Sequence, residues 1–374
     1  MSSTTLLLVV ALIGLALAVG FWMGRMTQRR TAASEPNAGA EPASHIPPPE
    51  HRPIEASRPP GRETRPASTA AAPSTSPSPA PIAGASPGAL LGRAQSWGYQ
   101  LQDLDVERAA TSTFDVLVID YSRDGTDESA LKPADLTKLK RKPDGSRRLV
   151  AAYLSIGEAE SYRYYWRKDW KRRRPAWLLS ENPDWDENYA VCFWDAGWQS
   201  LFCGSPEAYL DRIIAQGFDG IYLDKCDVTE DLRRRERDAA RTRPDLDGDM
   251  AAFVERLATY ARERRPGFLV IMQNAEPLLE RPRLRATLDA VAKEELLYGI
   301  DGAEKPNSRD DVAWSRERLD LMRRDGKPVL VVEYLDDKAK IAKAAQATRA
   351  LGYVLYVSDK SRELDKLQNR TEVA

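Results

Sequence analysis

Histidine is almost absent from this sequence. Its 374 residues include two histidines, His45 and His51, and both lie in a proline-rich stretch with few large apolar residues. Without histidine, the rest of the chain cannot form a Ser-His-Asp triad, a Cys-His pair or a histidine-ligated zinc site. An enzyme that works near neutral pH with this sequence must take its acid and base from carboxylates, lysine, tyrosine or cysteine.

Cysteine is also scarce. The three cysteines are Cys192, Cys203 and Cys226, and no two of them have the C-x-x-C spacing of a zinc ribbon or a thioredoxin-type motif. Cys192 and Cys203 could form a disulfide in an exported protein, or all three could serve as small apolar side chains. The sequence leaves both interpretations open.

An excess of charge of either sign is missing as well. The chain has 55 basic and 56 acidic residues, a net charge of −1, so it lacks the basic excess typical of nucleic-acid binding. It also lacks a glycine-rich dinucleotide fingerprint after its first apolar strand and a phosphate loop. We therefore expect no nucleic-acid partner, no cofactor and no bound metal.

One long apolar run is present, from Leu6 to Met23, and it is long enough to cross a bilayer as a helix. We expect residues 1–30 to form a signal anchor or transmembrane segment that is not cleaved. The cations just after the run, Arg25, Arg29 and Arg30, favour a cytoplasmic position for the rest of the chain. A protein that acts outside the cell would need the opposite orientation. We expect a membrane-anchored protein that is extracytoplasmic (cell envelope), or a secreted one.

Residues 31–96 are rich in proline, alanine and serine, as in the SPSPAP segment at 76–81. A segment of this composition has too few large apolar side chains to form a buried core. We therefore expect a disordered linker that acts as a semi-extended spacer. The folded domain is then expected at 97–374, held away from a membrane surface.

From Trp97 onward, short apolar runs alternate with amphipathic stretches, and Gly217 and Gly352 mark two helix stops. Continuous apolar strands separated by helices indicate a parallel sheet covered on both sides. Eight such units in this length predict an α/β fold, a (β/α)₈ TIM barrel, rather than an open doubly wound sheet. The expected strands are Gly98–Leu101, Asp115–Asp120, Leu149–Ser155, Gly220–Asp224, Phe268–Gln273, Ala290–Glu294, Pro328–Glu333 and Tyr353–Val357, and the expected helices include Pro206–Gln216, Met250–Arg265, Val312–Arg324 and Lys338–Leu351.

Two stretches are longer than the connections that a minimal barrel needs. Glu158–Gln199 is long and carries six of the nine tryptophans, and a loop of this length in a compact domain usually has a function. The second stretch, Asp227–Asp249, is charged and rich in arginine. We expect it to be a solvated helix that ends in a polar turn.

Polar residues end almost every expected strand. In this fold the functional residues gather at the carboxyl ends of the strands. A ring of carboxylates with tryptophan and tyrosine nearby suits glycoside hydrolysis, in which one carboxylic acid protonates the leaving oxygen and a second carboxylate attacks or activates water. The strand-end residues are Asp120, Ser155, Glu158, Asp224, Gln273, Asn274, Glu294, Glu295, Glu333, Tyr334, Ser358 and Asp359.

Five segments resemble the barrel proteins of glycoside hydrolase family 114, which includes endo-α-1,4-polygalactosaminidases. They are SIGEAE at 155–160, YRYYW at 162–166, GFDGIYLD at 217–224, MQNAE at 272–276 and KEELLYG at 293–299. The resemblance covers nearly all of 97–367 and implies a TIM barrel with a catalytic aspartate at Asp224 and a catalytic glutamate at Glu294. Glu295 is the alternative to Glu294 and points the other way if the strand continues.

The resemblance further implies that Asp224 is the nucleophile and Glu294 the acid/base of a retaining mechanism. In that case the two carboxyl groups should lie about 5–5.5 Å apart, whereas about 6.5–9.5 Å would indicate inversion. The substrate implied is a polysaccharide, with a galactosamine-containing exopolysaccharide as a candidate. The substrate-binding residues expected around this pair are Asp120, Tyr121, Glu158, Trp166, Trp194, Asp195, Tyr222, Gln273, Asn274, Tyr298 and Glu333.

Several residues also have simpler interpretations. Asp224 and Asp227 could hold a metal, but a helix cap is the more common role. The acidic residues at 245, 247 and 249 superficially resemble a calcium loop, but their glycine stands too early for an EF-hand, so a capped helix start is expected. Lys225 and Lys293 could bind an anion or pair with neighbouring carboxylates.

Two other functions fit parts of the pattern. A non-catalytic carbohydrate-binding protein of the cell envelope would use the same aromatic residues without acid/base geometry. A barrel lyase would need a glycine-rich phosphate loop after the seventh or eighth strand, and the segments at 334–337 and 358–362 contain no glycine.

Overall fold

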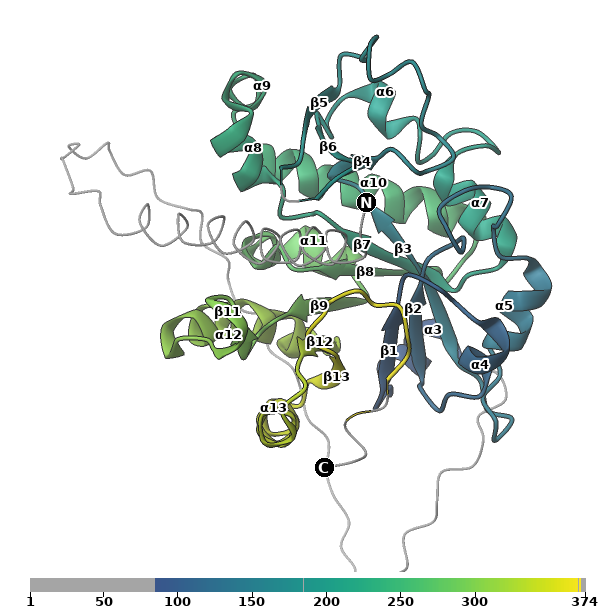
Figure 1. Ribbon diagram of the computed structural model, residues 1–374, viewed down its shortest axis with the longest axis vertical. Coiled ribbons are helices and arrows are strands. Elements are labelled where there is room, and N and C mark those ends of the chain that lie inside the picture. Colours follow the sequence, from purple (N-terminus) through teal and green to yellow (C-terminus); the bar gives the residue numbers. More distant parts are fainter. Residues whose placement is uncertain (1–84, 184, 369, 371–374) are drawn as a thin grey trace, which may run out of the picture.

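The computed structural model describes residues 85–183, 185–368 and 370 (Figure 1). The expected anchor at 1–30 and most of the expected linker lie outside these residues. Within the described part of the chain, no helix has the length and apolarity that a membrane span requires. The short helix α3 (Pro87–Leu91) lies inside the range expected for the linker, and its Leu91 side chain is buried. The described structure therefore begins before the predicted domain boundary at Trp97.

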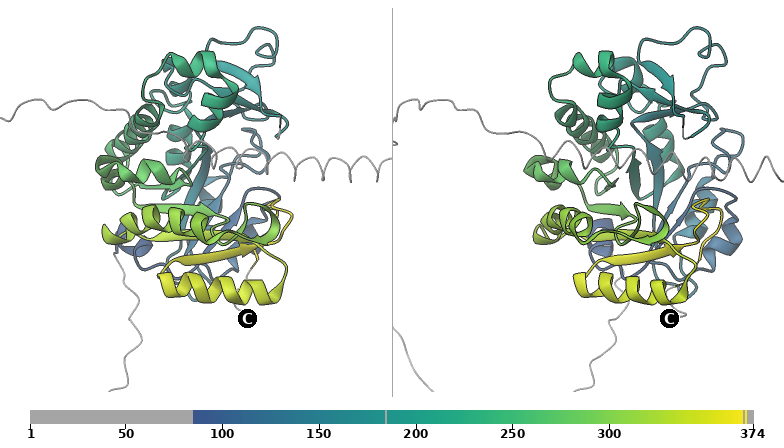
Figure 2. Two further views of the ribbon diagram at one scale, coloured as in Figure 1. Left: turned by 90° about the vertical axis from the view of Figure 1, so that its left-hand side faces the viewer. Right: turned by 60° about the vertical axis from the view of Figure 1, so that its left-hand side comes forward.

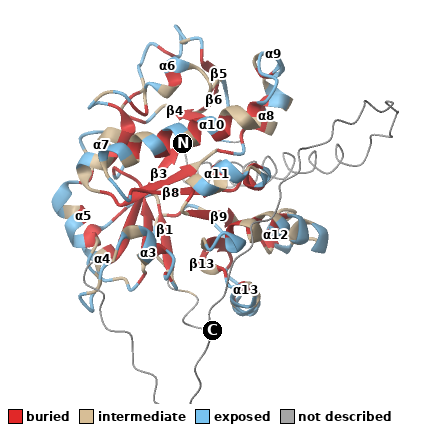
Figure 3. Cartoon of the chain, turned by 180° about the vertical axis from the view of Figure 1, so that it is seen from behind, coloured by how far each residue is buried: buried red, intermediate tan, exposed pale blue. Residues whose placement is uncertain are grey.

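Eight parallel strands form the central sheet, and their spatial order follows the sequence. Each strand is an apolar run that is buried along nearly its whole length, as expected for strands covered on both faces (Figure 3). The first and last strands lie side by side, and the Trp97 indole N–H donates a 3.0 Å hydrogen bond to the Val354 carbonyl. The result is a nearly closed barrel of β1 (Trp97–Gln100), β2 (Val116–Ile119), β3 (Leu149–Ser155), β7 (Gly220–Asp224), β8 (Leu269–Gln273), β9 (Ala290–Glu294), β12 (Val329–Tyr334) and β13 (Val354–Ser358).

Helices follow the strands and cover the outside of the barrel. Both predicted stops are confirmed, because Gly217 and Gly352 end their helices in the left-handed conformation, with φ of 99° and 66°. Three helices begin at other residues than predicted, namely at Tyr209, Leu246 and Arg309. Side-chain caps set the last two starts, because Asp245 accepts a hydrogen bond from the Gly248 backbone N–H and Ser308 accepts one from the Asp311 backbone N–H. The helices are α4 (Val106–Ala110), α5 (Pro133–Leu139), α7 (Tyr209–Gln216), α8 (Thr229–Arg235), α9 (Arg237–Arg241), α10 (Leu246–Arg264), η1 (Glu276–Glu280), α11 (Pro282–Thr287), α12 (Arg309–Arg324) and α13 (Lys338–Leu351).

The long tryptophan-rich stretch at 158–199 forms a separate lobe, here called the β4–β6 lobe. It contains a three-stranded antiparallel sheet of β4 (Glu158–Glu160), β6 (Asn188–Val191) and β5 (Leu178–Glu181), followed by α6 (Ala196–Gln199). Trp177 packs against both Trp170 and Trp198, with ring centroids 5.0 Å apart in each pair. The lobe follows the carboxyl end of β3 and stands at the opposite end of the molecule from α12 and α13 (Figure 2).

A short hairpin, β10 (Tyr298–Gly299) and β11 (Gly302–Pro306), follows β9. All three cysteines are free, with Cys203 and Cys226 buried and Cys192 half-buried. The cysteines therefore act as small apolar side chains here, and Cys192 and Cys203 are not joined.

Candidate active site

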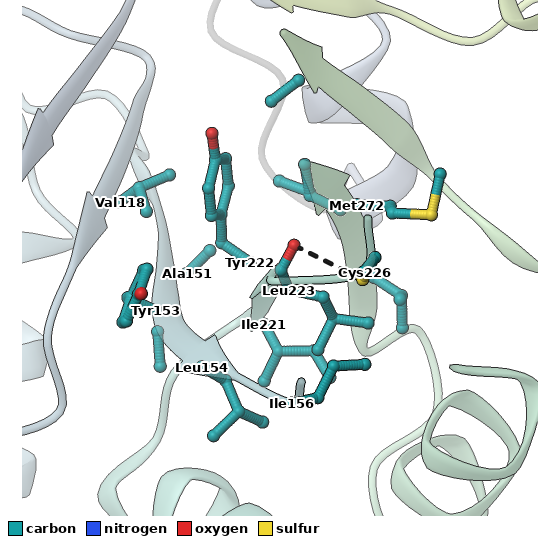
Figure 4. Close-up of a cluster of buried hydrophobic side chains, with 14 of the residues drawn as sticks. Val118, Ala151, Tyr153, Leu154, Ile156, Ile221, Tyr222, Leu223, Cys226 and Met272 are labelled. Carbon is teal, nitrogen blue, oxygen red and sulfur yellow. Dashed lines mark hydrogen bonds between the residues drawn. The ribbon is translucent and has the colours of Figure 1, made fainter. Parts of the chain in front are cut away.

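The register of the sheet decides which strand-end residues face the barrel interior. Alternate side chains of a strand point to opposite faces. Tyr222 projects from β7 on the side opposite to Ile221 and Leu223 (Figure 4). Asp224 is two residues further along and shares the side of Tyr222. Asp224 ends β7 and Glu294 ends β9, so both carboxylates stand at the carboxyl end of the barrel.

Asp224 accepts two hydrogen bonds. The Tyr153 hydroxyl donates to Oδ2 at 2.7 Å, and the backbone N–H of Lys225 donates to Oδ1 at 2.7 Å. Burial raises the pKa of Asp224 to about 7, and the negative charge of Glu294 adds to this rise, while the nearby Lys225 opposes it. The two carboxylates therefore lie close enough to influence each other.

Glu294 accepts hydrogen bonds from three side chains. The Gln273 amide and the Asn274 amide donate to Oε2, the latter at 3.2 Å, and the Tyr334 hydroxyl donates to Oε1. Asn274 also accepts from the Glu294 backbone N–H at 3.2 Å, and its own φ is 53°, a conformation that asparagine tolerates better than most residues. This network holds the Glu294 carboxylate in one orientation.

Aromatic side chains form the floor below the two carboxylates. The Tyr99 ring lies 5.2 Å from the Tyr222 ring and 5.8 Å from the Trp97 ring, and the Tyr99 hydroxyl donates to Gln273 Oε1 at 3.3 Å. The Tyr222 hydroxyl is buried without a hydrogen-bond partner among the described residues. Burial, followed by the charges of Glu294 and Asp224, raises the pKa of Tyr222 well above its ordinary value.

Glu158 and Lys225 form one part of the rim. Lys225 Nζ lies 3.3 Å from Glu158 Oε2, and the Asn182 side chain donates to Glu158 Oε1 at 2.9 Å. A Cβ atom at Gly157 would lie 2.2 Å from the Lys225 carbonyl oxygen. Glycine is therefore required at 157 for β4 to approach the loop after Asp224.

A buried ion cluster lies behind Tyr153. The Arg163 guanidinium bonds Asp120 Oδ2 at 2.6 Å and Glu160 Oε2 at 2.7 Å, and it lies 5.9 Å from the centre of the Tyr153 ring. Burial raises the pKa of Asp120, against the lowering effect of Arg163. Asp120, expected to bind substrate, is thus occupied by Arg163. The sequence pattern did not single out Tyr153 or Arg163, because only the fold shows which strand-end acid each would meet.

The structure gives four other expected binding residues structural partners instead. Tyr121 packs edge-on against Tyr209 at 4.8 Å and donates from its hydroxyl to a backbone carbonyl. Asp195 caps α6, and Tyr298 packs in a small apolar cluster with Leu335 and Ile341. Glu333 is fully buried and accepts the backbone N–H groups of residues 297 and 298 at 2.8 and 3.3 Å, and burial raises its pKa to about 8.

Trp166 and Trp194, also expected to bind substrate, are partly buried against the core. Trp166 lies 4.8 Å from the Tyr189 ring and Trp194 lies 5.1 Å from the Phe193 ring. Of the predicted substrate-binding residues, the structure brings Tyr222, Gln273 and Asn274 around Asp224 and Glu294 and places Glu158 on the rim.

Two of the simpler interpretations are confirmed, the ion pair of Lys293 and the helix cap of Asp245. In contrast, α8, which follows Asp224 and Asp227, begins without a side-chain cap. Glu295 is buried in an ion pair with Arg362, and Lys293 pairs with Glu276 at 2.9 Å. Asp245 caps a helix, as expected. Across the described ranges, no group of three or more histidine, cysteine or acidic side chains is arranged to hold a metal ion.

Comparisons with known proteins identify the family of this chain. The family model described as glycoside-hydrolase family GH114 matches residues 75–372. The uncharacterised protein MJ1477 of Methanocaldococcus jannaschii is 37% identical over 282 residues, covering 72% of this chain and 77% of that protein. An uncharacterised protein of Deinococcus radiodurans is 38% identical over 294 residues, covering 77% of this chain and 87% of that protein.

A solved structure shares the fold. The glycoside hydrolase domain of PelA from Pseudomonas aeruginosa superposes with a TM-score of 0.53 at 22% identity, covering 73% of this chain and 97% of that domain. The family match spans the whole barrel, including both strand-end carboxylates. The chain therefore belongs to glycoside hydrolase family GH114 and is a glycosidase.

Proposed function

We propose that this glycosidase hydrolyses a polysaccharide and that Asp224 and Glu294 are its catalytic pair. The observation that carries the proposal is that Asp224 ends β7 and Glu294 ends β9, the two strands on either side of β8, so both carboxylates stand at the carboxyl end of one barrel. Each carboxylate also receives a hydrogen bond from a tyrosine, Asp224 from Tyr153 and Glu294 from Tyr334. Two interacting carboxylates of different environment are what a glycosidase needs to separate the roles of acid and nucleophile.

In the proposed retaining mechanism, the Asp224 carboxylate attacks the anomeric carbon while Glu294 donates a proton to the leaving oxygen. Glu294 then takes a proton from water, and the resulting hydroxide releases the sugar from Asp224. Because Asp224 has a pKa of about 7, it must lose its proton before it can attack. This assignment predicts that kcat/KM falls on the acidic side of about pH 7, whereas an acid role for Asp224 predicts a fall on the alkaline side.

The charge of the site supports an amino-sugar polymer, such as a galactosamine-containing polysaccharide, as the substrate. Three carboxylates, Asp224, Glu294 and Glu158, stand at the site and its rim, and the rim cation Lys225 is already paired with Glu158. Two further carboxylates, Asp120 and Glu160, are buried behind Tyr153, where they share the single cation of Arg163. Such a site attracts a positively charged substrate.

The test is a screen of the purified protein against galactosaminogalactan and other exopolysaccharides, with release of reducing ends as the readout. We expect Asp224→Asn and Glu294→Gln each to abolish release, because each removes a group that reacts. Full activity in either variant would remove that residue from the mechanism. Saturable binding without any product would instead support a non-catalytic binding protein.

Anomeric configuration is measured in the same experiment. NMR of the first product should show the configuration of the substrate, as retention requires. Chemical rescue with azide separates the two roles: Asp224→Gly should give a glycosyl azide of inverted configuration, and Glu294→Ala one of retained configuration. The opposite pattern would exchange the roles.

The location of the enzyme stays a prediction based on the apolar run at 6–23. We propose that this run anchors the barrel at the cell envelope. Fractionation of cells that express the whole chain tests it, since a protein that stays in the soluble fraction would contradict the anchor.

A further inference from the structure

Two exposed aromatic side chains lie on the β4–β6 lobe, which follows the carboxyl end of β3. The exposed large hydrophobic side chains of the described residues are Tyr162, Trp185 and Trp314, which are 40%, 43% and 42% exposed. The β4–β6 lobe buries most of its other aromatic rings. Exposure of Tyr162 and Trp185 on the same lobe therefore calls for a reason.

A chain of contacts leads from Asp224 to Tyr162. Tyr153 bonds Asp224, and the Arg163 guanidinium lies 5.9 Å from the Tyr153 ring and 5.0 Å from the Tyr162 ring. The Tyr162 hydroxyl donates to Glu160 Oε1 at 2.6 Å. The Tyr162 ring is thus held in a defined orientation by Glu160 and Arg163, and a chain of three contacts joins it to Asp224.

A second chain of contacts leads from Asp224 to Trp185. Lys225, the next residue after Asp224, pairs with Glu158, and Asn182 bonds the other oxygen of Glu158. The Trp185 backbone N–H then donates to the Asn182 carbonyl at 3.3 Å. The turn that carries Trp185 is therefore fastened to the rim of the site.

The two aromatic residues belong to adjoining segments. Ser161, which precedes Tyr162, donates from its backbone N–H to the Glu187 carbonyl at 2.8 Å and from its hydroxyl to Glu187 Oε1 at 3.0 Å. Glu187 lies in the same turn as Trp185. Tyr162 and Trp185 are consequently parts of one edge of the lobe, reached from Asp224 by two separate routes.

We propose that Tyr162 and Trp185 form a platform that binds sugar units of the polysaccharide beyond the bond that is cleaved. Exposed aromatic faces pack against the apolar faces of sugar rings and remove that surface from water. The Tyr162 ring is held by Glu160 and Arg163, and the backbone turn of Trp185 is held by Asn182, so less ordering is needed when a chain binds. This inference rests on the proposed function and adds to it a preference for long substrates.

Trp314 provides a matched control. It is exposed to the same extent as Trp185, but it lies on α12, where Arg318 stacks on its ring at 4.2 Å and pairs with Glu280. The ring of Trp314 contacts Arg318 on α12, and its neighbour Ser315 leads to Asn274 through Glu276 and Lys293. A general effect of removing an exposed tryptophan should therefore appear equally in Trp314→Ala.

The experiment measures initial rates of the full chain on galactosaminogalactan, or on whichever polysaccharide of the panel the protein cleaves. We expect Trp185→Ala to raise KM for the polymer about tenfold with a much smaller change in kcat. Trp185→Phe should recover most of the affinity, and Trp314→Ala should match the unmodified protein. Tyr162→Ala should also raise KM, while Tyr162→Phe, which keeps the ring, should raise it less.

Binding without turnover gives an independent readout. In the Glu294→Gln background, the Trp185→Ala change should weaken co-sedimentation with the polymer by a similar factor. If the protein cleaves the polymer and Trp185→Ala leaves both KM and binding unchanged, or if Trp314→Ala weakens them equally, the platform is wrong while the proposed function stands. If the protein neither cleaves nor binds any polysaccharide of the panel, both proposals fall.

Discussion

The hydroxyl of Tyr153 donates a 2.7 Å hydrogen bond to Oδ2 of Asp224. Tyr153 lies on β3 and Asp224 at the end of the neighbouring β7, so the sheet register itself sets this contact. The bond favours the ionised form of Asp224 and lowers its pKa against the stronger raising effect of burial. Under the proposed mechanism, Tyr153 is a positioning residue that also sets the pH above which Asp224 can act as a nucleophile.

Tyr153→Phe should raise the pKa of Asp224 further above about 7, because it removes a donor that stabilises the carboxylate. We expect the acidic limb of the kcat/KM profile to move to higher pH by roughly half to one unit. Tyr121→Phe is the control, since its hydroxyl bonds the Gly125 carbonyl rather than a carboxylate. An acidic limb that stays in place in Tyr153→Phe would show that this bond does not influence Asp224.

Asn274 combines a functional contact with a strained backbone, and two substitutions separate them. Both Asn274→Gly and Asn274→Ala remove the amide that bonds Glu294, so kcat should fall by roughly ten- to a hundredfold in each. Asn274→Ala should also be less stable than Asn274→Gly by about 1 kcal/mol, because φ is 53° at this position. Steady-state kinetics and denaturant unfolding measure the two effects. Equal stability of the two variants would contradict the strain.

Glu333→Gln tests the buried carboxyl of β12. The pKa of Glu333 is raised from 4.5 to about 8, so the folded protein keeps a proton that the unfolded chain loses near pH 4.5. The free energy of unfolding of the wild type should therefore fall between about pH 4.5 and 8, by at most about 1.4 kcal/mol per pH unit from this group. The glutamine in Glu333→Gln cannot titrate. The free energy of unfolding of this variant, relative to that of the wild type, should therefore rise as the pH increases over this range. Urea unfolding at several pH values checks this, and a constant difference would contradict the raised pKa.

Removing only one member of the buried ion pair between Lys293 and Glu276 should lower the free energy of unfolding strongly. Both side chains are 6% exposed, and although burial alone would raise the pKa of Glu276, Lys293 holds it below its ordinary value. Lys293→Met should lower the free energy of unfolding by about 3 kcal/mol, because Glu276 would remain buried without its cation. The double variant Lys293→Met with Glu276→Leu should recover much of this loss. Thermal and denaturant unfolding measure both, and a double variant no more stable than the single one would refute the pairing argument.

The barrel could be predicted because its signals are local. Each strand is a continuous apolar run, and the glycines at 217 and 352 end helices through their own backbone freedom. The helix starts were less accurate because caps such as Ser308 come before the amphipathic pattern begins. The strand-end positions of Asp224 and Glu294 could be read from the same local pattern.

The local pattern did not predict the partners of residues whose surroundings come from distant segments of the chain. Glu333 ends an apolar strand just as Asp224 does, yet it points out of the barrel and bonds the backbone after β9. Tyr121 and Tyr298 are likewise turned toward covering helices. Strand alternation separates inward from outward positions only when the register with the neighbouring strands is known.

The sequence alone determines that the segment from Trp97 onward contains no histidine, so acid/base work in the barrel falls to carboxylates, lysine, tyrosine or cysteine, since composition limits which groups can exchange protons. It also determines the parallel barrel, because apolar periodicity is a property of neighbouring residues. Only the tertiary structure decides which acids come together. Tyr153 meets Asp224 across 71 residues and Tyr334 meets Glu294 across 40, and such contacts arise from strand register, which no local pattern encodes.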